Sequence, residues 1–164
     1  MKLLYITAKI HICDYNELQS NEKIIINSAK EACFRAYAPY SRFLVGAAVS
    51  LANGEIVTGS NQENAAFPSG LCAERTALFY ANSQYPDQAV KFMAIAAYTQ
   101  GDFVDRPVSP CGACRQVILE TEMRYRNPIR ILLYGKSEIY MIEGIKDLLP
   151  LSFNSIEQNA DGTD

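Results

Sequence analysis

The chain has 164 residues, of which 49% are hydrophobic, and a formal net charge of -3 at pH 7. This length suits one domain whose core needs no disulfide, and the acidic balance argues against nucleic acid and anionic membranes as partners. The five cysteines cannot all pair, and no export signal is apparent, so we expect reduced thiols or a metal site and a cytoplasmic location.

The N-terminal part of the chain predicts a strand followed by a helix. Residues 3–13 alternate between apolar side chains on one face and more polar side chains on the other, which is typical of a strand. We expect this strand to add to the edge of a sheet or to extend a subunit contact. Apolar positions then recur at helical spacing over residues 22–38, and Pro39 disfavours helical backbone immediately before it.

A hairpin is predicted next. Two runs typical of strands, 43–52 and 55–58, flank Asn53-Gly54, the dipeptide that best tolerates the positive φ angles of a type I′ turn. Helices and strands alternate along the rest of the chain. The remaining predicted elements are a helix at 69–81, a strand at 90–99, a helix at 109–121, and strands at 129–134 and 138–142.

The strand at 90–99 decides the expected fold. Its centre, 92–97, is apolar at every position, so both of its faces must be buried, which requires helices above and below the sheet. We therefore expect an α/β fold, a three-layer α/β/α sandwich around a mixed five-stranded sheet with an extra N-terminal strand. The expected division is an N-terminal strand extension at 1–18, one domain at 19–153 and a polar tail at 154–164.

A Cys-x-x-Cys pair, Cys111 and Cys114, lies where a helix is expected to begin. Ser109 is a good N-cap and Pro110 suits the first helical turn, so both sulfurs would lie at the positive end of the helix, where thiolates are stabilised. Cys72 stands at the start of another helical pattern. Three thiolates would leave one position of a tetrahedral zinc ion open for water, as catalytic zinc sites do.

Glu74 lies two residues after Cys72, where its carboxylate would point toward the open position without ligating the metal. In the alternative interpretation it only stabilises the positive end of its helix. A redox-active Cys-x-x-Cys is a further alternative, but it explains neither Glu74 nor Cys72. We expect His11 to lie on the surface of an edge strand, and Cys13 and Cys33 to be small core or interface residues.

These residues resemble the zinc deaminase signature, which combines a Cys or His, a Glu and a Pro-Cys-x-x-Cys. The all-cysteine form is similar to the small homotetrameric cytidine deaminases. The resemblance covers residues 24–153 and is carried by YAPYSRFLVGAA at 37–48, NQENAAF at 61–67, CAERTA at 72–77 and PVSPCGACRQV at 107–117. It implies that Cys72, Cys111 and Cys114 bind one zinc ion per subunit. It also implies that Glu74 transfers protons between the attacking water, ring N3 and the leaving amine.

The resemblance further implies how a nucleoside would be held. Asn61 and Glu63 would hydrogen-bond the ribose 3′-hydroxyl, and Phe43 would pack against the nucleoside. The backbone of Ala73 would contact the base carbonyl. The backbone of Ser109 would meet the departing ammonia.

Three more residues have implied roles around this site. Arg75 would hydrogen-bond the zinc thiolates and offset their negative charge, the alternative being an ordinary surface ion pair. Phe153 would reach the active site of a neighbouring subunit and stack on the base. Phe67 stands where the family most often has Tyr, which removes one polar contact near the pocket and the subunit interface.

The expected function is hydrolytic deamination of cytidine and 2′-deoxycytidine to uridine and 2′-deoxyuridine plus ammonia, a reaction of pyrimidine salvage, in a homotetramer with shared active sites. One alternative is deamination of a related cytosine nucleoside antibiotic. Another is a zinc-stabilised RNA-binding or editing module, against which the acidic balance argues. A catalytically inactive homologue could lack Glu74, which is present here.

Overall fold

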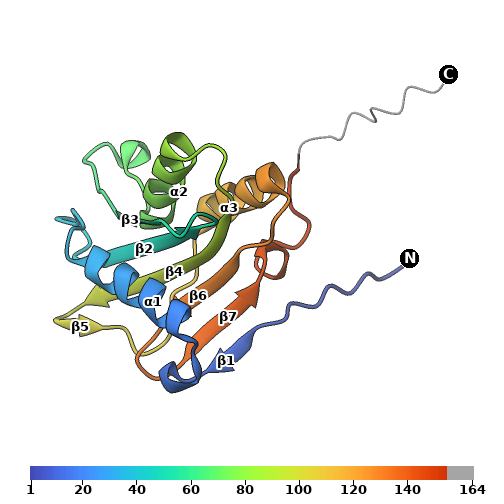
Figure 1. Cartoon of the computed structure of the whole chain (residues 1–164), viewed down its shortest axis with the longest axis horizontal. Coiled ribbons are helices and arrows are strands. Elements are labelled where there is room, and N and C mark those ends of the chain that lie inside the picture. The colour runs from blue at the N-terminus through green and yellow to red at the C-terminus, as the bar shows by residue number, and fades with distance from the viewer. Residues whose placement is uncertain (155–164) are drawn as a thin grey trace.

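The computed structural model describes residues 1–154, in which three α-helices and one mixed sheet form the fold (Figure 1). In chain order the elements are β1 (His11–Cys13), α1 (Ser20–Cys33), β2 (Leu44–Leu51), β3 (Ile56–Ser60), α2 (Ala73–Gln84), β4 (Val90–Thr99), β5 (Asp102–Phe103), α3 (Gly112–Tyr125), β6 (Arg130–Tyr134) and β7 (Ile139–Glu143). Short 3-10 turns lie at Tyr15–Glu17, Phe67–Ser69 and Ile145–Asp147. None of the described helices combines the length and apolar character that a membrane crossing needs.

The strands pair in the order β1-β7-β6-β4-β2-β3, and β5 pairs with the end of β4. Only β4 and β6 run parallel, and every other pair is antiparallel. The mixed sheet and the edge position of the N-terminal strand are thus as predicted. The two-residue strand β5 was not predicted, and it brings the sheet to seven strands.

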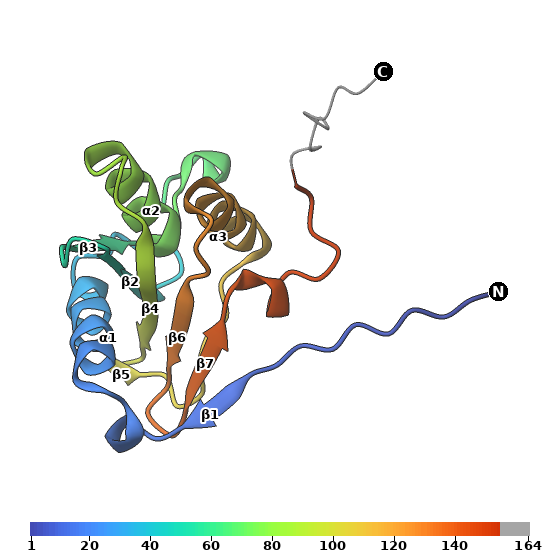
Figure 2. The same ribbon diagram turned by 45° about the vertical axis from the view of Figure 1, so that its right-hand side comes forward.

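Helices cover both faces of the sheet, as Figure 2 shows. Alternate residues of β4 point to opposite faces. Met93 and Ile95 pack in the core beneath α2 and α3, whereas Ala94 and Ala96 pack in the core beneath α1. The predicted three-layer α/β/α sandwich is therefore confirmed.

Helix α1 ends at Cys33, five residues before the predicted end at 38. The reason is a tertiary contact of Tyr37, whose backbone N–H donates to the Asn61 carbonyl at 3.0 Å and whose carbonyl accepts from the Glu63 N–H at 2.8 Å. A backbone committed to this bridge cannot continue a helical ladder. The prediction that the helix continues to the residue before Pro39 was therefore wrong.

The predicted hairpin of β2 and β3 is present, but its turn is not type I′. A type I′ turn needs positive φ at both central residues, whereas Gly54 alone has one, at 89°. The loop closes with the Leu51 N–H donating to the Glu55 carbonyl at 2.9 Å. In the three-residue loop Ala52-Asn53-Gly54, glycine is needed only at the last position, where the backbone adopts a positive φ angle before β3.

Helices α2 and α3 begin later than predicted, and each begins directly after a cysteine. The α2 helix starts at Ala73 rather than 69, because Leu71 exchanges two backbone hydrogen bonds with Gln62, at 2.8 and 2.9 Å, and is held extended. The α3 helix starts at Gly112 rather than 109. The N-caps are therefore Cys72 and Cys111, and the prediction of Ser109 as an N-cap was wrong.

The N-terminal strand is shorter than the predicted 3–13. Only His11–Cys13 pair with β7, and the preceding residues extend away from the body of the molecule (Figure 2). His11 is exposed on this edge strand and Cys33 is buried in the core, as predicted. Of the predicted polar tail at 154–164, residues 155–164 lie outside the described part of the chain.

Candidate active site

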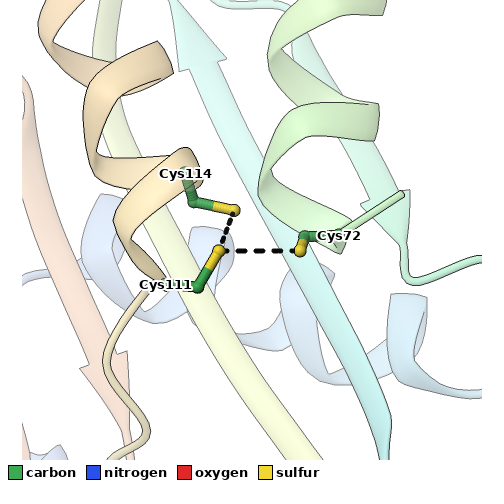
Figure 3. Close-up of side chains that lie close together, drawn as sticks. All are labelled: Cys72, Cys111 and Cys114. Carbon is green, nitrogen blue, oxygen red and sulfur yellow. Dashed lines mark hydrogen bonds between the residues drawn. The ribbon is translucent and has the colours of Figure 1, made fainter. Parts of the chain in front are cut away.

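Three cysteine sulfurs meet at the N-terminal ends of two helices (Figure 3). Cys72 caps α2, Cys111 caps α3, and Cys114 lies in the first turn of α3. The Sγ of Cys111 is 3.8 Å from that of Cys72 and 3.3 Å from that of Cys114. The sequence predicted this grouping from two helix starts. The fold brings those starts together because α2, which follows β3, and α3, which follows β5, lie side by side on one face of the sheet.

The spacing of these sulfurs suits a zinc ion. A tetrahedral zinc ion binds each sulfur at about 2.3 Å, which places two sulfurs about 3.8 Å apart. All three sulfurs lie within 4.8 Å of one another, and no fourth His, Cys, Asp or Glu of residues 1–154 joins the group. A disulfide would need about 2.05 Å between two sulfurs, and the cysteines are free thiols. The donor set thus leaves one coordination position without a protein ligand.

The electrostatics of the cluster favour negative charge on sulfur. Hydrogen bonds from Cys114, then from Arg75 and Cys111, lower the pKa of the Cys72 thiol to about 5 against the opposing effect of burial. The bond that Cys114 gives to Cys72, together with burial, raises the pKa of the Cys114 thiol. The cluster therefore favours negative charge on the Cys72 sulfur, at a helix end whose dipole attracts negative charge.

Glu74 lies in the first turn of α2, beside the cluster but not within it. The residue is only 5% exposed, and this burial is the main reason why the pKa of its carboxyl group is raised. Charged groups are seldom buried to this extent unless they have partners or a function. A carboxyl group with a raised pKa next to a metal site is suited to accept and return protons.

Arg75 follows in the same turn and supplies positive charge. Its Nη2 lies 3.8 Å from the Cys72 Sγ, and the neighbouring thiols raise the pKa of its guanidinium group. Its Nε is buried and has no hydrogen-bond partner. Buried N–H groups are nearly always paired, so this unpaired donor points to a site that binds a negatively charged or polar group.

A pocket of about 580 Å³ opens beside Cys72 and Arg75. Its volume lies in the range of about 300–1,000 Å³ that is typical of small-molecule sites. The loop between β3 and α2 forms most of its wall, and the loop before β2 completes it. The lining residues are Tyr40, Ser41, Asn61, Gln62, Glu63, Asn64, Phe67, Gly70, Leu71, Cys72 and Arg75.

Two polar side chains in this pocket are held in place by backbone groups. The Glu63 carboxylate accepts the N–H groups of Tyr40 at 2.8 Å and Ser41 at 3.3 Å, and hydrogen bonds from Ser41 and Tyr40 lower its pKa. The Asn61 side chain accepts the Val45 N–H at 2.8 Å and donates to the Phe43 carbonyl at 2.9 Å. Each side chain keeps spare hydrogen-bonding capacity for a ligand.

Comparison with known proteins shows which family this chain belongs to. The family described as "Cytidine and deoxycytidylate deaminase zinc-binding region" matches residues 19–126, well over half of the chain. The chain belongs to this family.

Several similar proteins match this chain over nearly their whole length. A cytidine deaminase of Halalkalibacterium halodurans is 46% identical over 147 residues, which are 85% of this chain and 98% of the relative. One of Mycobacterium tuberculosis is 37% identical over 143 residues, covering 85% and 90% respectively. The crystal structure of cytidine deaminase from Burkholderia pseudomallei superposes with a TM-score of 0.69 at 36% identity, covering 83% of this chain and 100% of that one.

Of the other predicted site residues, only Phe67 lines this pocket. Ala73 is buried as the first residue of α2, Ser109 is exposed just before α3, and Phe43 is half-buried directly before β2. Phe153 is 79% exposed, and its carbonyl accepts the Gln116 Nε2 at 2.8 Å. Phe67 lines the pocket, with its ring edge-to-face with Tyr40 at 6.0 Å.

Sequence reasoning missed the role of Tyr40 and Ser41. Their backbone N–H groups fix the Glu63 carboxylate, although the two residues are 22 or more positions away in sequence. Both belong to the segment 37–48 that carried the family resemblance, which was the available signal. A local side-chain pattern does not indicate contacts that depend on backbone N–H groups this far away in sequence.

Gly59 of β3 sets the position of Cys72, because a Cβ added there would lie 2.5 Å from both the Ala73 carbonyl oxygen and the Ala77 nitrogen. We expect Gly59→Ala to push α2 off the sheet, lowering the free energy of unfolding by about 1–3 kcal/mol and reducing bound zinc. Urea denaturation and metal analysis measure the two effects. In the control Gly112→Ala, the new Cβ meets nothing within 4 Å, so an equal loss of stability there would contradict this explanation.

Proposed function

We propose that the protein is a zinc-dependent enzyme that hydrolyses the exocyclic amino group of cytidine and 2′-deoxycytidine, releasing uridine or 2′-deoxyuridine and ammonia. The carrying observation is the cluster of three thiols beside the buried Glu74, at the end of a pocket of about 580 Å³. The names of the similar proteins support the same substrate class. Loss of cytidine absorbance on incubation with zinc-loaded protein is the direct test, and an inactive zinc-loaded protein would contradict the proposal.

Cys72, Cys111 and Cys114 would hold one zinc ion per subunit. Bound zinc lowers the pKa of water and so supplies a nucleophile near neutral pH. The Glu74 carboxylate would accept one proton from the attacking water and pass it to ring N3. It would then accept the second proton from the new hydroxyl group at C4 and pass it to the departing nitrogen. This last transfer matters because the amine leaves as neutral ammonia rather than as an unstable anion.

Arg75 would balance the negative charge of three thiolates. A ligand set of three thiolates around one divalent zinc ion carries a net charge of about -1, and the Arg75 guanidinium is the cation placed next to Cys72. We expect Arg75→Gln to keep the fold but to weaken zinc retention about 10–100-fold, as loss of groups that contact metal ligands usually does. Zinc competition with a chelator measures this.

A matched control for Arg75→Gln is Arg124→Gln, which removes the same charge from the far end of α3, where the guanidinium binds the Pro86 carbonyl at 3.1 Å. Equal zinc retention in the two variants and in the unmodified protein would exclude Arg75 from the site.

Asn61 and Glu63 would bind the ribose 3′-hydroxyl. We expect Glu63→Gln to lower kcat/KM for cytidine by about tenfold or more, because the acceptor of the ribose hydrogen bond loses its charge. The matched comparison is 2′,3′-dideoxycytidine, which has no 3′-hydroxyl: the variant and the unmodified protein should process it at similar rates. An equal loss with both substrates would mean that Glu63 acts through the loop at Tyr40 and Ser41 instead.

We also propose the assembly and setting that the family resemblance implies. The exposed Phe153 ring at the end of the described chain suits a contact with a neighbouring active site, and we propose a homotetramer in which active sites are shared. Free thiols support a cytoplasmic location, and the reaction would serve pyrimidine salvage. Sedimentation analysis tests the assembly, and a fully active monomer would contradict it.

A further inference from the structure

Residues 1–10 form an extended arm whose N-terminal end leaves the body of the molecule (Figure 2), while Ile6, Thr7 and Lys9 line a hollow beside the segment that follows β7. Its large apolar side chains are exposed, with Leu4 at 74%, Tyr5 at 81% and Ile6 at 51%. The family match begins at residue 19, so the arm is an addition to the family domain. Contiguous exposed apolar side chains of this kind mark a surface that another molecule covers.

The arm and β1 carry a self-complementary pattern. In a strand, every second residue points to the same face. The even-numbered face is apolar in its centre, basic at its N-terminal end and acidic at its C-terminal end. Its residues are Lys2, Leu4, Ile6, Ala8, Ile10, Ile12 and Asp14. If a second copy of this strand is set antiparallel to the first with the two Ala8 residues opposite each other, every apolar residue faces an apolar residue. Lys2 of each copy then faces Asp14 of the other.

The backbone of the arm is free to pair on one side. β1 is the last strand of the sheet and uses one edge to pair with β7. The Lys9 N–H points to the same side, donating at 3.1 Å to Asp147, which follows β7. Because successive residues of a strand direct their N–H and C=O groups to opposite edges, the even-numbered residues up to Ile12 present theirs to the open edge. The Asp14 N–H instead donates to the Glu17 carboxylate at 2.7 Å, so Asp14 offers only its charge to the partner arm.

We propose that the arms of two copies of this chain pair as antiparallel strands across a two-fold axis at Ala8. Leu4 then lies opposite Ile12 of the second copy, and Ile6 lies opposite Ile10. Lys2 faces Asp14 at each end of the ribbon. A register centred two residues away would set Lys2 or Asp14 against an apolar side chain, which opposes it.

The pairing joins the sheets of the two copies at their β1 edges. Such an interface is isologous, since the same residues serve both copies. It also covers an edge strand that would otherwise be open to unspecific pairing. The interface uses no residue of the proposed active site, so its failure and the failure of the proposed function are separate results.

Disulfide trapping tests both the pairing and its register. Opposite residues of a hydrogen-bonded antiparallel pair have Cα atoms about 5.5 Å apart, which a disulfide can bridge. We expect zinc-loaded Ala8→Cys, mildly oxidised, to shift on a non-reducing gel from 18.2 kDa to twice that mass. Ile6→Cys should stay at the single-chain mass, because its two copies lie about 13 Å apart along the ribbon. The double variant Ile6→Cys/Ile10→Cys should cross-link again.

Charge reversal in the Ala8→Cys background gives an independent check. Ile6→Lys alone should prevent the cross-link by setting a lysine against Ile10 of the second copy. Adding Ile10→Glu should restore it, because each new lysine then faces a new glutamate.

Three results would overturn the pairing. If Ala8→Cys does not cross-link, the arm binds something other than a second arm. If Ala8→Cys and Ile6→Cys cross-link equally, the two arms meet without a fixed register. If Ile10→Glu gives no rescue, the register is wrong.

Discussion

Replacement of Glu74 by Gln is expected to lower the turnover of cytidine by about a hundredfold to ten-thousandfold, the usual contribution of general acid–base catalysis. The amide has nearly the same size as the carboxylate, so the side chain should still fit its buried position, which is 5% exposed in the structure. It cannot accept and return a proton. Absorbance assays beside metal analysis should therefore find an almost inactive protein with a full zinc content.

The matched control is Glu120→Gln, which makes the same change at an exposed position on α3. Its activity should equal that of the unmodified protein. The decisive comparison is made at equal zinc content: if zinc-loaded Glu74→Gln deaminates cytidine at the unmodified rate, Glu74 carries no proton and the proposed mechanism fails.

Replacement of Cys114 by Ser is expected to remove both zinc and activity. Cys114 is fully buried, and its sulfur lies 3.3 Å from that of Cys111. A serine hydroxyl is a much poorer zinc ligand than a thiolate, because the thiolate forms at accessible pH and the alkoxide does not. Loss of a group that only contacts a ligand usually weakens metal affinity about 10–100-fold. Loss of the ligand Cys114 itself should weaken zinc affinity by more than that.

Metal analysis after dialysis measures the effect of Cys114→Ser, and Cys13→Ser is the matched control. Cys13 is a half-buried free thiol in β1, away from the cluster. The control should retain one zinc ion per subunit and full activity. Stoichiometric zinc in Cys114→Ser would show that another group completes the site and would remove Cys114 from the ligand set.

The sequence predicted the elements well where local pattern and burial agree. The apolar run at the centre of β4 requires a strand buried on both faces, and β4 indeed lies at Val90–Thr99. The ends of the helices were predicted less well. Tyr37 and Leu71 look compatible with helix, yet both are held extended by backbone bonds to the segment after β3. Those bonds depend on residues distant in sequence, which a local pattern does not contain.

The chemistry of the candidate site could also be predicted from local sequence. Cys72, Glu74, Cys111 and Cys114 are unusual residue types at helix starts, and the sequence by itself determined that they form a candidate metal site with an adjacent acid. Only the tertiary structure decided that the three sulfurs lie within 4.8 Å of one another and that Glu74 is buried. It also decided that Tyr40 and Ser41 hold Glu63. Residue chemistry is local to the chain, whereas distance, burial and backbone contacts arise only when the sheet sets α2 beside α3.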